Sequence, residues 1–261
     1  MTTFDAGPPE PFATMFAQAP DYVAYRQHFW YDWGQVFYRG RLDGSARVLC
    51  IASDPGPTER LVGRTLVGDA GQRVQGFLAK LGLTHSYICL NAFTFALHPS
   101  AGAQAPSVLA DPALRAWRNA TFDAVAASSP LEAIVAFGAN AQEAARLWTA
   151  RPVMPFEAIP HPSSRDSKAL LDAWRGAVKR LRTTIQPDPD GSTSGPNYGT
   201  SFLEADYAPI PRADLPFGVP AWLGDDAWGR TASPRHNNSV ARPSPDDGHT
   251  LVWRAPQTIG P

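Results

Sequence analysis

Three polar residues stand where apolar runs end, and their side chains could carry out chemistry together. Asp54 follows the run Val48–Ala52 and lies in Ser-Asp-Pro-Gly-Pro, where two prolines and a glycine end a strand. Asn91 ends a second apolar run, and His161 follows a third in Pro-His-Pro-Ser-Ser. A carboxylate, an amide and an imidazole can stabilise a cationic transition state, hold an anionic leaving group and bind the edge of a base.

Each of these residues also has a simpler interpretation. Asp-Pro-Gly is favourable turn chemistry, so Asp54 could serve only to form the turn. Asn91 could cap the following segment, and His161 could be an ordinary loop histidine. The stretch Gly63–Gly71 is rich in glycine, but it matches neither GxGxxG nor GxxxxGK[ST]. It therefore does not predict a dinucleotide site or a P-loop.

The elements that would position these residues alternate between strands and helices. Strands are predicted at Val48–Ala52, Tyr87–Leu90, Ala133–Phe137 and Phe156–Ile159, and helices at 74–81, 113–127, 139–150 and 167–182. This alternation is typical of a parallel sheet with helices on both faces. The predicted fold is therefore an α/β three-layer sandwich with a central four-stranded parallel sheet. Because the carboxyl ends of parallel strands share one edge, we expect Asp54, Asn91 and His161 to converge there.

The chain is expected to divide near residue 185. Residues 1–185 contain the alternating pattern and predict the α/β domain, whereas residues 186–261 are rich in proline and glycine and lack periodicity. This irregular C-terminal extension still carries large aromatic side chains, including Trp222, Trp228 and Trp253. We expect it partly to wrap the domain and partly to be disordered.

Composition limits the classes of protein to which the chain can belong. Hydrophobic residues make up 44% of the chain and charged residues 18%, with a net charge of −1, as in a soluble globular protein. Acidic residues gather after residue 186, which leaves a mildly basic body compatible with a phosphate-bearing partner. No signal peptide and no apolar run of about 18 residues is seen, so we expect a cytoplasmic location and no membrane partner. We also expect a monomer.

The two cysteines do not predict a metal site. Cys50 and Cys89 each lie inside an apolar run, and no CxxC pair is present. They are expected to be reduced thiols in the core, so neither a zinc site nor an iron–sulfur cluster is predicted, and no cofactor is expected.

Four stretches in order resemble the uracil-DNA glycosylase superfamily between about Arg39 and Arg182. IASDPGPTE resembles the first motif, written GQDPY or GEAPG, and GRTLVGDAG resembles the GRPFVGxAG stretch that follows it. LEAIVAFGANAQEAARL resembles the third strand and helix, and IPHPSS resembles the HPS motif. The four cysteines of the iron–sulfur members are missing.

The resemblance implies roles for the residues that match these motifs. Against GQDPY, Asp54 falls on the catalytic aspartate that stabilises an oxocarbenium-like sugar and orients the attacking water, whereas against GEAPG the acidic position falls on Ser53. His161 matches the histidine that binds the base oxygen and stabilises the departing anion. Asn91 resembles the asparagine that reads the Watson–Crick edge.

The resemblance also implies contacts to DNA near the HPS motif. Ser163 resembles a phosphate-binding serine, with Ser164 beside it, and Arg165 falls near the side chain that wedges into the base stack during flipping. Arg39 and Arg41, in a predicted hairpin or loop at 36–44, are candidate contacts to a bulky polar substituent.

Two departures from the family pattern bear on the substrate. Gly56 stands where GQDPY has a tyrosine, and Leu66 stands where GRPFVG has a phenylalanine that stacks on uracil. Both changes replace an aromatic side chain by a smaller one, which predicts a roomier base pocket. The expected function is a monofunctional DNA glycosylase acting on a 5-substituted pyrimidine, such as glucosylated hydroxymethylcytosine of phage DNA, in antiviral defence.

Other functions remain open from the sequence. The first alternative is uracil excision in DNA repair, with stacking by another aromatic residue such as Phe93 or Tyr38. The second is a catalytically silent nucleic-acid-binding module on the same fold. A small-molecule nucleotide hydrolase is a weaker option, because the basic body and the HPS motif do not require polymeric DNA.

Overall fold

The computed structural model describes residues 4–219 and two later strand segments, β6 (Val240–Ala241) and β7 (Val252–Trp253). Of the aromatic residues noted in the extension, Trp222 and Trp228 lie outside the described residues, and only the backbone strand is described for Trp253. β6 and β7 pair antiparallel with each other.

The fold is mixed α/β, with a five-stranded sheet in the order β1-β3-β2-β4-β5. Its strands are β1 (Tyr38–Gly40), β2 (Val48–Ala52), β3 (Tyr87–Asn91), β4 (Ala133–Phe137) and β5 (Phe156–Ile159). The four strands from β2 to β5 are mutually parallel and occupy the positions that the sequence predicts.

The expectation of four strands was wrong because β1 adds a fifth. It lies inside the predicted hairpin or loop and pairs antiparallel with β3, with Tyr38 opposite Leu90. A strand of three residues is too short for an alternating pattern to be recognised. Gly40 completes it with a positive φ of 104°, and a Cβ at this position would lie 2.4 Å from the carbonyl oxygen of Tyr87.

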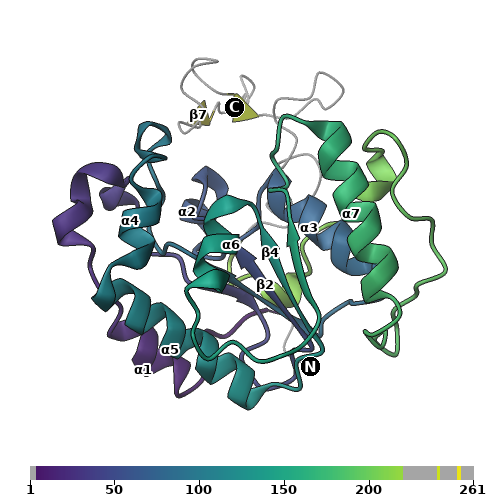
Figure 1. The fold of residues 1–261 in the computed structure, drawn as a ribbon, viewed down its shortest axis with the longest axis horizontal. Helices are drawn as coiled ribbons and strands as arrows, with labels where there is room; N and C mark the ends of the chain where they lie inside the picture. Colours follow the sequence, from purple (N-terminus) through teal and green to yellow (C-terminus); the bar gives the residue numbers. More distant parts are fainter. Residues whose placement is uncertain (1–3, 220–239, 242–251, 254–261) are drawn as a thin grey trace, which may run out of the picture.

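The helices are α1 (Phe12–Ala17), α2 (Pro57–Val62), α3 (Asp69–Lys80), α4 (Ala105–Ala110), α5 (Pro112–Ser128), α6 (Ala139–Arg146) and α7 (Ser167–Leu181). In Figure 1, α1, α4 and α5 lie to one side of the sheet and α3 and α7 to the other. No helix in the described part of the chain has both the length and the apolar character needed to cross a bilayer.

Alternation along the strands explains why helices pack on both faces. Leu49 and Ile51 of β2 belong to a hydrophobic cluster shared with α1, α4, α5 and α6, whereas Val48 and Cys50 belong to a second cluster shared with α3 and α7. Neighbouring strand residues point to opposite faces, so a continuous apolar strand supplies both cores. Cys50 and Cys89 are buried and free.

Residues 186–219 pack against the α/β domain through buried carboxylates. Asp188 accepts hydrogen bonds from three backbone N–H groups of the turn before β3 and pairs with Arg47. Asp206 pairs with Lys80 of α3 at 2.8 Å. These fixed donors offset the cost of removing the carboxylates from water, so this part of the extension is held at defined points.

Asp214 makes the most buried of these contacts. Its Oδ2 atom lies 2.9 Å from Arg39 Nη1 and accepts a hydrogen bond of 2.7 Å from the Tyr87 hydroxyl, while its Oδ1 lies 2.6 Å from Arg41 Nη2. The side chains of Arg39 and Asp214 are both fully buried. Each charge therefore depends on the other, because neither has access to water.

We expect the substitution Asp214→Ala to destabilise the protein by about 3–5 kcal/mol, because it leaves the Arg39 guanidinium buried without its anionic partner. Chemical denaturation followed by circular dichroism measures this change. The matched control is Asp172→Ala, which removes a half-exposed carboxylate paired with Lys168 and Arg175 and should cost far less, because water screens exposed ion pairs. Equal losses in the two variants would contradict the prediction.

Candidate active site at the strand ends

The register of the sheet brings the ends of four strands to one edge. Ala52, the last residue of β2, lies opposite Asn91 at the end of β3. On the other side, Gly138 follows β4 and donates its backbone N–H to Ile159 of β5 at 2.8 Å. The segments that follow these strands therefore begin at one edge of the sheet. Asp54 follows β2 and His161 follows β5, with β4 between these two strands.

Asp54 is held by two hydrogen bonds in a half-buried position. Its Oδ1 accepts from the Ser53 hydroxyl at 2.6 Å, and its Oδ2 accepts from the backbone N–H of Leu97 at 2.9 Å. Burial raises the pKa of Asp54 to about 6, although both hydrogen bonds oppose that shift and the charge of Glu59 adds to it slightly. The carboxylate is thus ionised at neutral pH but destabilised relative to one in water.

Asn140 orients the Ser53 hydroxyl and was not predicted from the sequence. Its Nδ2 donates to Ser53 Oγ at 2.9 Å, and that hydroxyl in turn donates to Asp54. Asn140 lies in the first turn of α6, and this helix begins directly after Gly138. An asparagine three residues beyond the end of β4 was the available signal, but only the packing of β4 beside β2 reveals its partner.

Glu59 is a second buried carboxylate beside the Asp54 loop. Its Oε2 accepts from the backbone N–H of Gly56 at 3.0 Å, and its Oε1 accepts from those of Val67 and Gly68 at 2.7 and 2.9 Å. It therefore ties the Asp54 loop to the turn before α3. A Cβ on Gly56 would lie 2.7 Å from Glu59 Oε2, so the absence of a side chain at Gly56 also has this structural reason.

His161 is positioned as a neutral hydrogen-bond donor. Its Nδ1 atom accepts from the backbone N–H of Ser163 at 3.1 Å. Burial, followed by the positive charge of Arg73, lowers the pKa of His161 to about 4. The imidazole is therefore neutral at pH 7, and with Nδ1 accepting a hydrogen bond its proton resides on Nε2.

Arg73 connects this histidine loop to the C-terminal extension. Its Nη1 donates to the carbonyl oxygen of Pro162 at 2.7 Å, and its Nε donates to the Tyr207 hydroxyl at 3.0 Å. The same guanidinium lies 4.7 Å from the ring centroid of Phe202. The extension thus holds the cation that sits beside His161, a contribution that the sequence did not predict.

Asn91 lies at the same edge, with its amide tied to neighbouring segments. Its Oδ1 accepts from the Thr65 hydroxyl, and its Nδ2 donates to the carbonyl oxygen of Val36 at 3.3 Å. The side chain is buried. The protein thus engages both the oxygen and the nitrogen of the amide, and the base-reading role of Asn91 stays a prediction.

The structure does not place Leu66 at the wall of an open base pocket. Leu66 is buried in the hydrophobic cluster that packs α3 and α7 on the sheet, and its φ is +53°. Phe93 and Tyr38, the alternative stacking residues, are also buried in a core cluster. In the loop after His161, Ser163 and Arg165 are exposed and Ser164 is half-buried, and their contacts to DNA stay a prediction.

Arg39 and Arg41 do not reach this edge, contrary to their expected contact with a base substituent. β1 runs antiparallel to β3, so the residues that follow it approach the opposite edge, where Arg41 donates its backbone N–H to Tyr87. Both arginines are instead paired with Asp214. The sequence could not show this because the antiparallel direction of β1 and the position of Asp214 are tertiary features.

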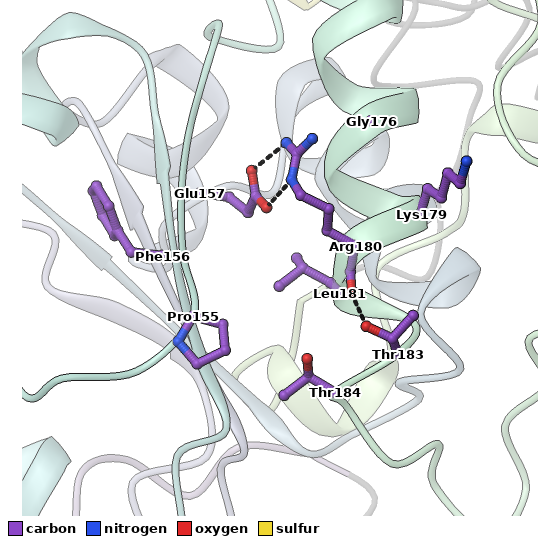
Figure 2. A pocket seen from close by; sticks show the side chains of 9 residues that line it. All are labelled: Pro155, Phe156, Glu157, Gly176, Lys179, Arg180, Leu181, Thr183 and Thr184. Atoms are coloured by element: carbon purple, nitrogen blue, oxygen red, sulfur yellow. Dashed lines mark hydrogen bonds and ion pairs between the residues drawn. The ribbon is translucent and has the colours of Figure 1, made fainter.

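One groove among the described residues lies away from the strand ends. It encloses about 760 Å³ between β5 and the carboxyl-terminal part of α7, and Glu157 and Arg180 form an ion pair at 2.7 Å within its lining (Figure 2). Phe156 at the start of β5 lines it, so it opens toward the amino end of that strand. None of the predicted site residues lines this groove.

A possible metal-binding group also lies away from the strand ends. Among the described residues, His85, Asp188 and Asp190 bring their ligand atoms within 4.8 Å of one another. Asp188, however, already accepts three backbone hydrogen bonds and pairs with Arg47. These contacts account for its carboxylate without an ion, so the group is best explained as an anchor of the extension.

No protein-family model matches this chain, and no curated protein is similar enough in sequence to be a match. The functional argument therefore depends on the residues and their geometry.

We expect Arg73→Met to raise the pKa of His161, because the substitution removes the nearby positive charge. The pKa should remain below 6.5, since burial, the larger cause of the lowering, is retained. A nuclear magnetic resonance titration of the His161 ring protons measures the effect. The control is Arg165→Met. It removes a positive charge four residues from His161, but Arg165 is not among the causes of the lowered pKa of His161. An unchanged pKa in Arg73→Met would contradict this account of the site.

Proposed function

We propose that this protein is a monofunctional DNA glycosylase that hydrolyses the N-glycosidic bond of a flipped pyrimidine and leaves an abasic site. The observation that carries the proposal is the position of two groups at the same edge of the sheet, one after β2 and one after β5. Asp54 is a half-buried carboxylate with a pKa of about 6, and His161 is a neutral imidazole with a pKa of about 4. The resemblance of four ordered motifs to the uracil-DNA glycosylase superfamily supports the same reaction.

Asp54 would act on the sugar. Glycosidic bonds break through a transition state with positive charge on the sugar ring, as in other glycoside hydrolyses. The ionised Asp54 carboxylate stabilises that charge and accepts a hydrogen bond from the attacking water. Because Ser53 and Leu97 already hold its two oxygens, the carboxylate is preorganised rather than reoriented during the reaction.

His161 would act on the departing base. When the bond between C1′ and the base nitrogen breaks, its electron pair stays on the base, and water forms the new bond to C1′. The Nε2–H of neutral His161 donates to a base carbonyl oxygen and stabilises this anion. Asp54 takes up the proton that the attacking water releases. This proton finally protonates the base anion, so the base leaves as a neutral molecule.

The substrate we propose is a 5-substituted pyrimidine, such as the glucosylated hydroxymethylcytosine of phage DNA, and the role is antiviral defence in the cytoplasm by a monomer. The support is the absence of an aromatic side chain at Gly56, since Leu66 is buried in a core cluster. Arg39 and Arg41 pair with Asp214 and do not support this choice of substrate. The lack of a side chain at Gly56 also leaves room for Glu59. Uracil excision is accordingly the alternative that substrate tests must separate.

The substrate test compares DNA containing uracil, phage DNA containing glucosylated hydroxymethylcytosine, and the same phage DNA without the modification. Abasic sites are counted by alkaline cleavage. Release confined to the modified DNA supports the defence role, whereas release confined to uracil supports the repair alternative. If every DNA is bound and none loses a base, the glycosylase proposal is wrong and the silent binding module is favoured.

We expect Asp54→Asn to lower the rate of base release by about 10²–10⁴-fold, because the amide has no charge to stabilise the sugar cation. DNA affinity should stay within about twofold of the wild type, as measured by fluorescence anisotropy. Asp172→Asn removes a surface carboxylate and should leave both quantities unchanged. A rate similar to wild type in Asp54→Asn would remove Asp54 from the mechanism.

The pH dependence of kcat/KM should follow Asp54 alone between pH 5 and 8. The carboxylate must be ionised to act, so activity should rise with pH and level off above its pKa of about 6. His161 has a pKa of about 4, so it stays neutral and adds no fall in activity. A bell-shaped profile that declines between pH 6 and 8 would instead indicate that His161 acts as a protonated acid.

A further inference from the structure

We propose that Asn140 is a positioning residue, which acts through the Ser53 hydroxyl to keep the Asp54 carboxylate charged and oriented for the reaction proposed above. We call these three side chains the relay. The inference rests on the proposed function, because it takes Asp54 as the group that acts on the sugar. It adds to that function the residues that set the protonation state of the carboxylate.

The relay is a chain of hydrogen bonds across two neighbouring strands. Asn140 Nδ2 donates to Ser53 Oγ at 2.9 Å, and the Ser53 hydroxyl donates to Asp54 Oδ1 at 2.6 Å. Ser53 and Asp54 directly follow β2, whereas Asn140 lies in the first turn of α6, after β4. Because β2 and β4 pair in parallel, both segments start at the sheet edge of the candidate site. The relay therefore ties the Asp54 loop to the next strand of the sheet.

The direction of these hydrogen bonds is fixed by the Asp54 carboxylate. An ionised carboxylate can only accept, so the single hydrogen of the Ser53 hydroxyl must point toward it. The serine oxygen is then left as an acceptor, and the Asn140 amide must present its NH2 group rather than its oxygen. The NH2 group of Asn140 thus holds the serine in the orientation that donates to Asp54.

The relay suits the ionised form of Asp54 better than the protonated form. If a protonated Asp54 donated to Ser53 Oγ, that oxygen would receive two donors, and the serine hydrogen would have no acceptor in the relay. The backbone N–H of Leu97, which binds the other carboxylate oxygen at 2.9 Å, can likewise only donate. Both hydrogen bonds lower the pKa of Asp54, whereas burial and the charge of Glu59 in α2 raise it. The relay therefore offsets part of the effect of burial.

The backbone before Asn140 is fixed against the second chemical group of the site. Gly138 has a positive φ of 87°, and a Cβ at this position would lie 2.8 Å from the Cβ of His161. Gly138 also donates its N–H to the carbonyl oxygen of Ile159, two residues before His161. The start of α6 therefore lies against the His161 segment and binds the Asp54 loop through the relay. It acts as a spacer between the two proposed catalytic groups.

Loss of the relay would affect the reaction most near neutral pH. Asp54 must be charged to stabilise the sugar cation, and its pKa of about 6 lies close to that range. A further rise of about one pH unit would leave about half of the carboxylates protonated at pH 7. At pH 9 nearly all of them would still be charged, so the rate there should change little.

The test is a titration of Asp54 by carbon-13 nuclear magnetic resonance, in which the carboxyl signal of Asp54 is the one absent from Asp54→Asn. We expect Ser53→Ala to raise the pKa of Asp54 by about one pH unit, because it removes a hydrogen bond to the charged form. Asn140→Ala should raise the pKa less, since the serine remains but is free to rotate. Ser53→Thr retains a hydroxyl and should keep the pKa near that of the wild type.

The double variant Ser53→Ala/Asn140→Ala shows whether Asn140 acts through Ser53. If it does, the double variant should have the pKa of Ser53→Ala alone, because without the hydroxyl Asn140 has no contact that leads to Asp54. Gln142→Ala is the matched control. It removes an amide of the same helix that donates to Ile159 at 3.0 Å, outside the relay, and should leave the pKa of Asp54 unchanged. Thermal melting checks that each variant is folded.

The same variants are assayed for base release from pH 5 to pH 9, on the DNA that the wild type acts on most rapidly. The rise of kcat/KM with pH should move to higher pH by the same amount as the pKa of Asp54 in each variant. A merely structural role would instead lower the rate equally at every pH.

The outcomes separate the relay from the proposed function. The relay is overturned if Asn140→Ala leaves the pKa of Asp54 as in the wild type, if the shifts of the two single variants add, or if base release keeps its pH profile. If the pKa values change as expected but the wild type releases no base from any DNA, the relay holds and the glycosylase proposal fails.

Discussion

Burial of the Asp54 carboxylate is the constraint on which the proposed site depends. A negative charge removed from water must be met by fixed donors, and Ser53 and Leu97 supply them from two different segments. Asn140 orients the serine in turn. These donors do not fully compensate for burial, which is why the pKa stays raised to about 6. The carboxylate is consequently charged at neutral pH, yet poised to interact strongly with a nearby cation.

The same need to compensate buried charge connects the extension with the domain. Asp214 neutralises Arg39 inside the fold, and Asp188 accepts hydrogen bonds from three backbone N–H groups of the turn before β3. Tyr207 holds Arg73, whose charge helps to keep His161 neutral. Residues 186–219 are thus part of the structure that sets the electrostatics of the candidate site, even though their sequence lacks the periodicity of regular elements.

Several residues have structural roles that limit what their types imply about a substrate. Gly56 leaves room for Glu59, which binds the backbone of two loops, and Leu66 fills the core beneath α3. A small residue at a position where the resembled motif has an aromatic one can therefore reflect local packing as well as a larger pocket. Our substrate proposal consequently depends on direct comparison of modified and unmodified DNA more than on these two positions.

The sequence by itself determined the four parallel strands and the meeting of their ends, because continuous apolar runs and the residues that stop them are local signals. It also identified Asp54 and His161 as chemical groups at those ends. Only the tertiary structure decided the direction of β1, the pairing of Arg39 with Asp214, and the contacts of Asn140 and Glu59. Each of these joins residues distant along the chain or depends on a close approach in space. The pKa values of Asp54 and His161 likewise follow from burial, which no short motif encodes.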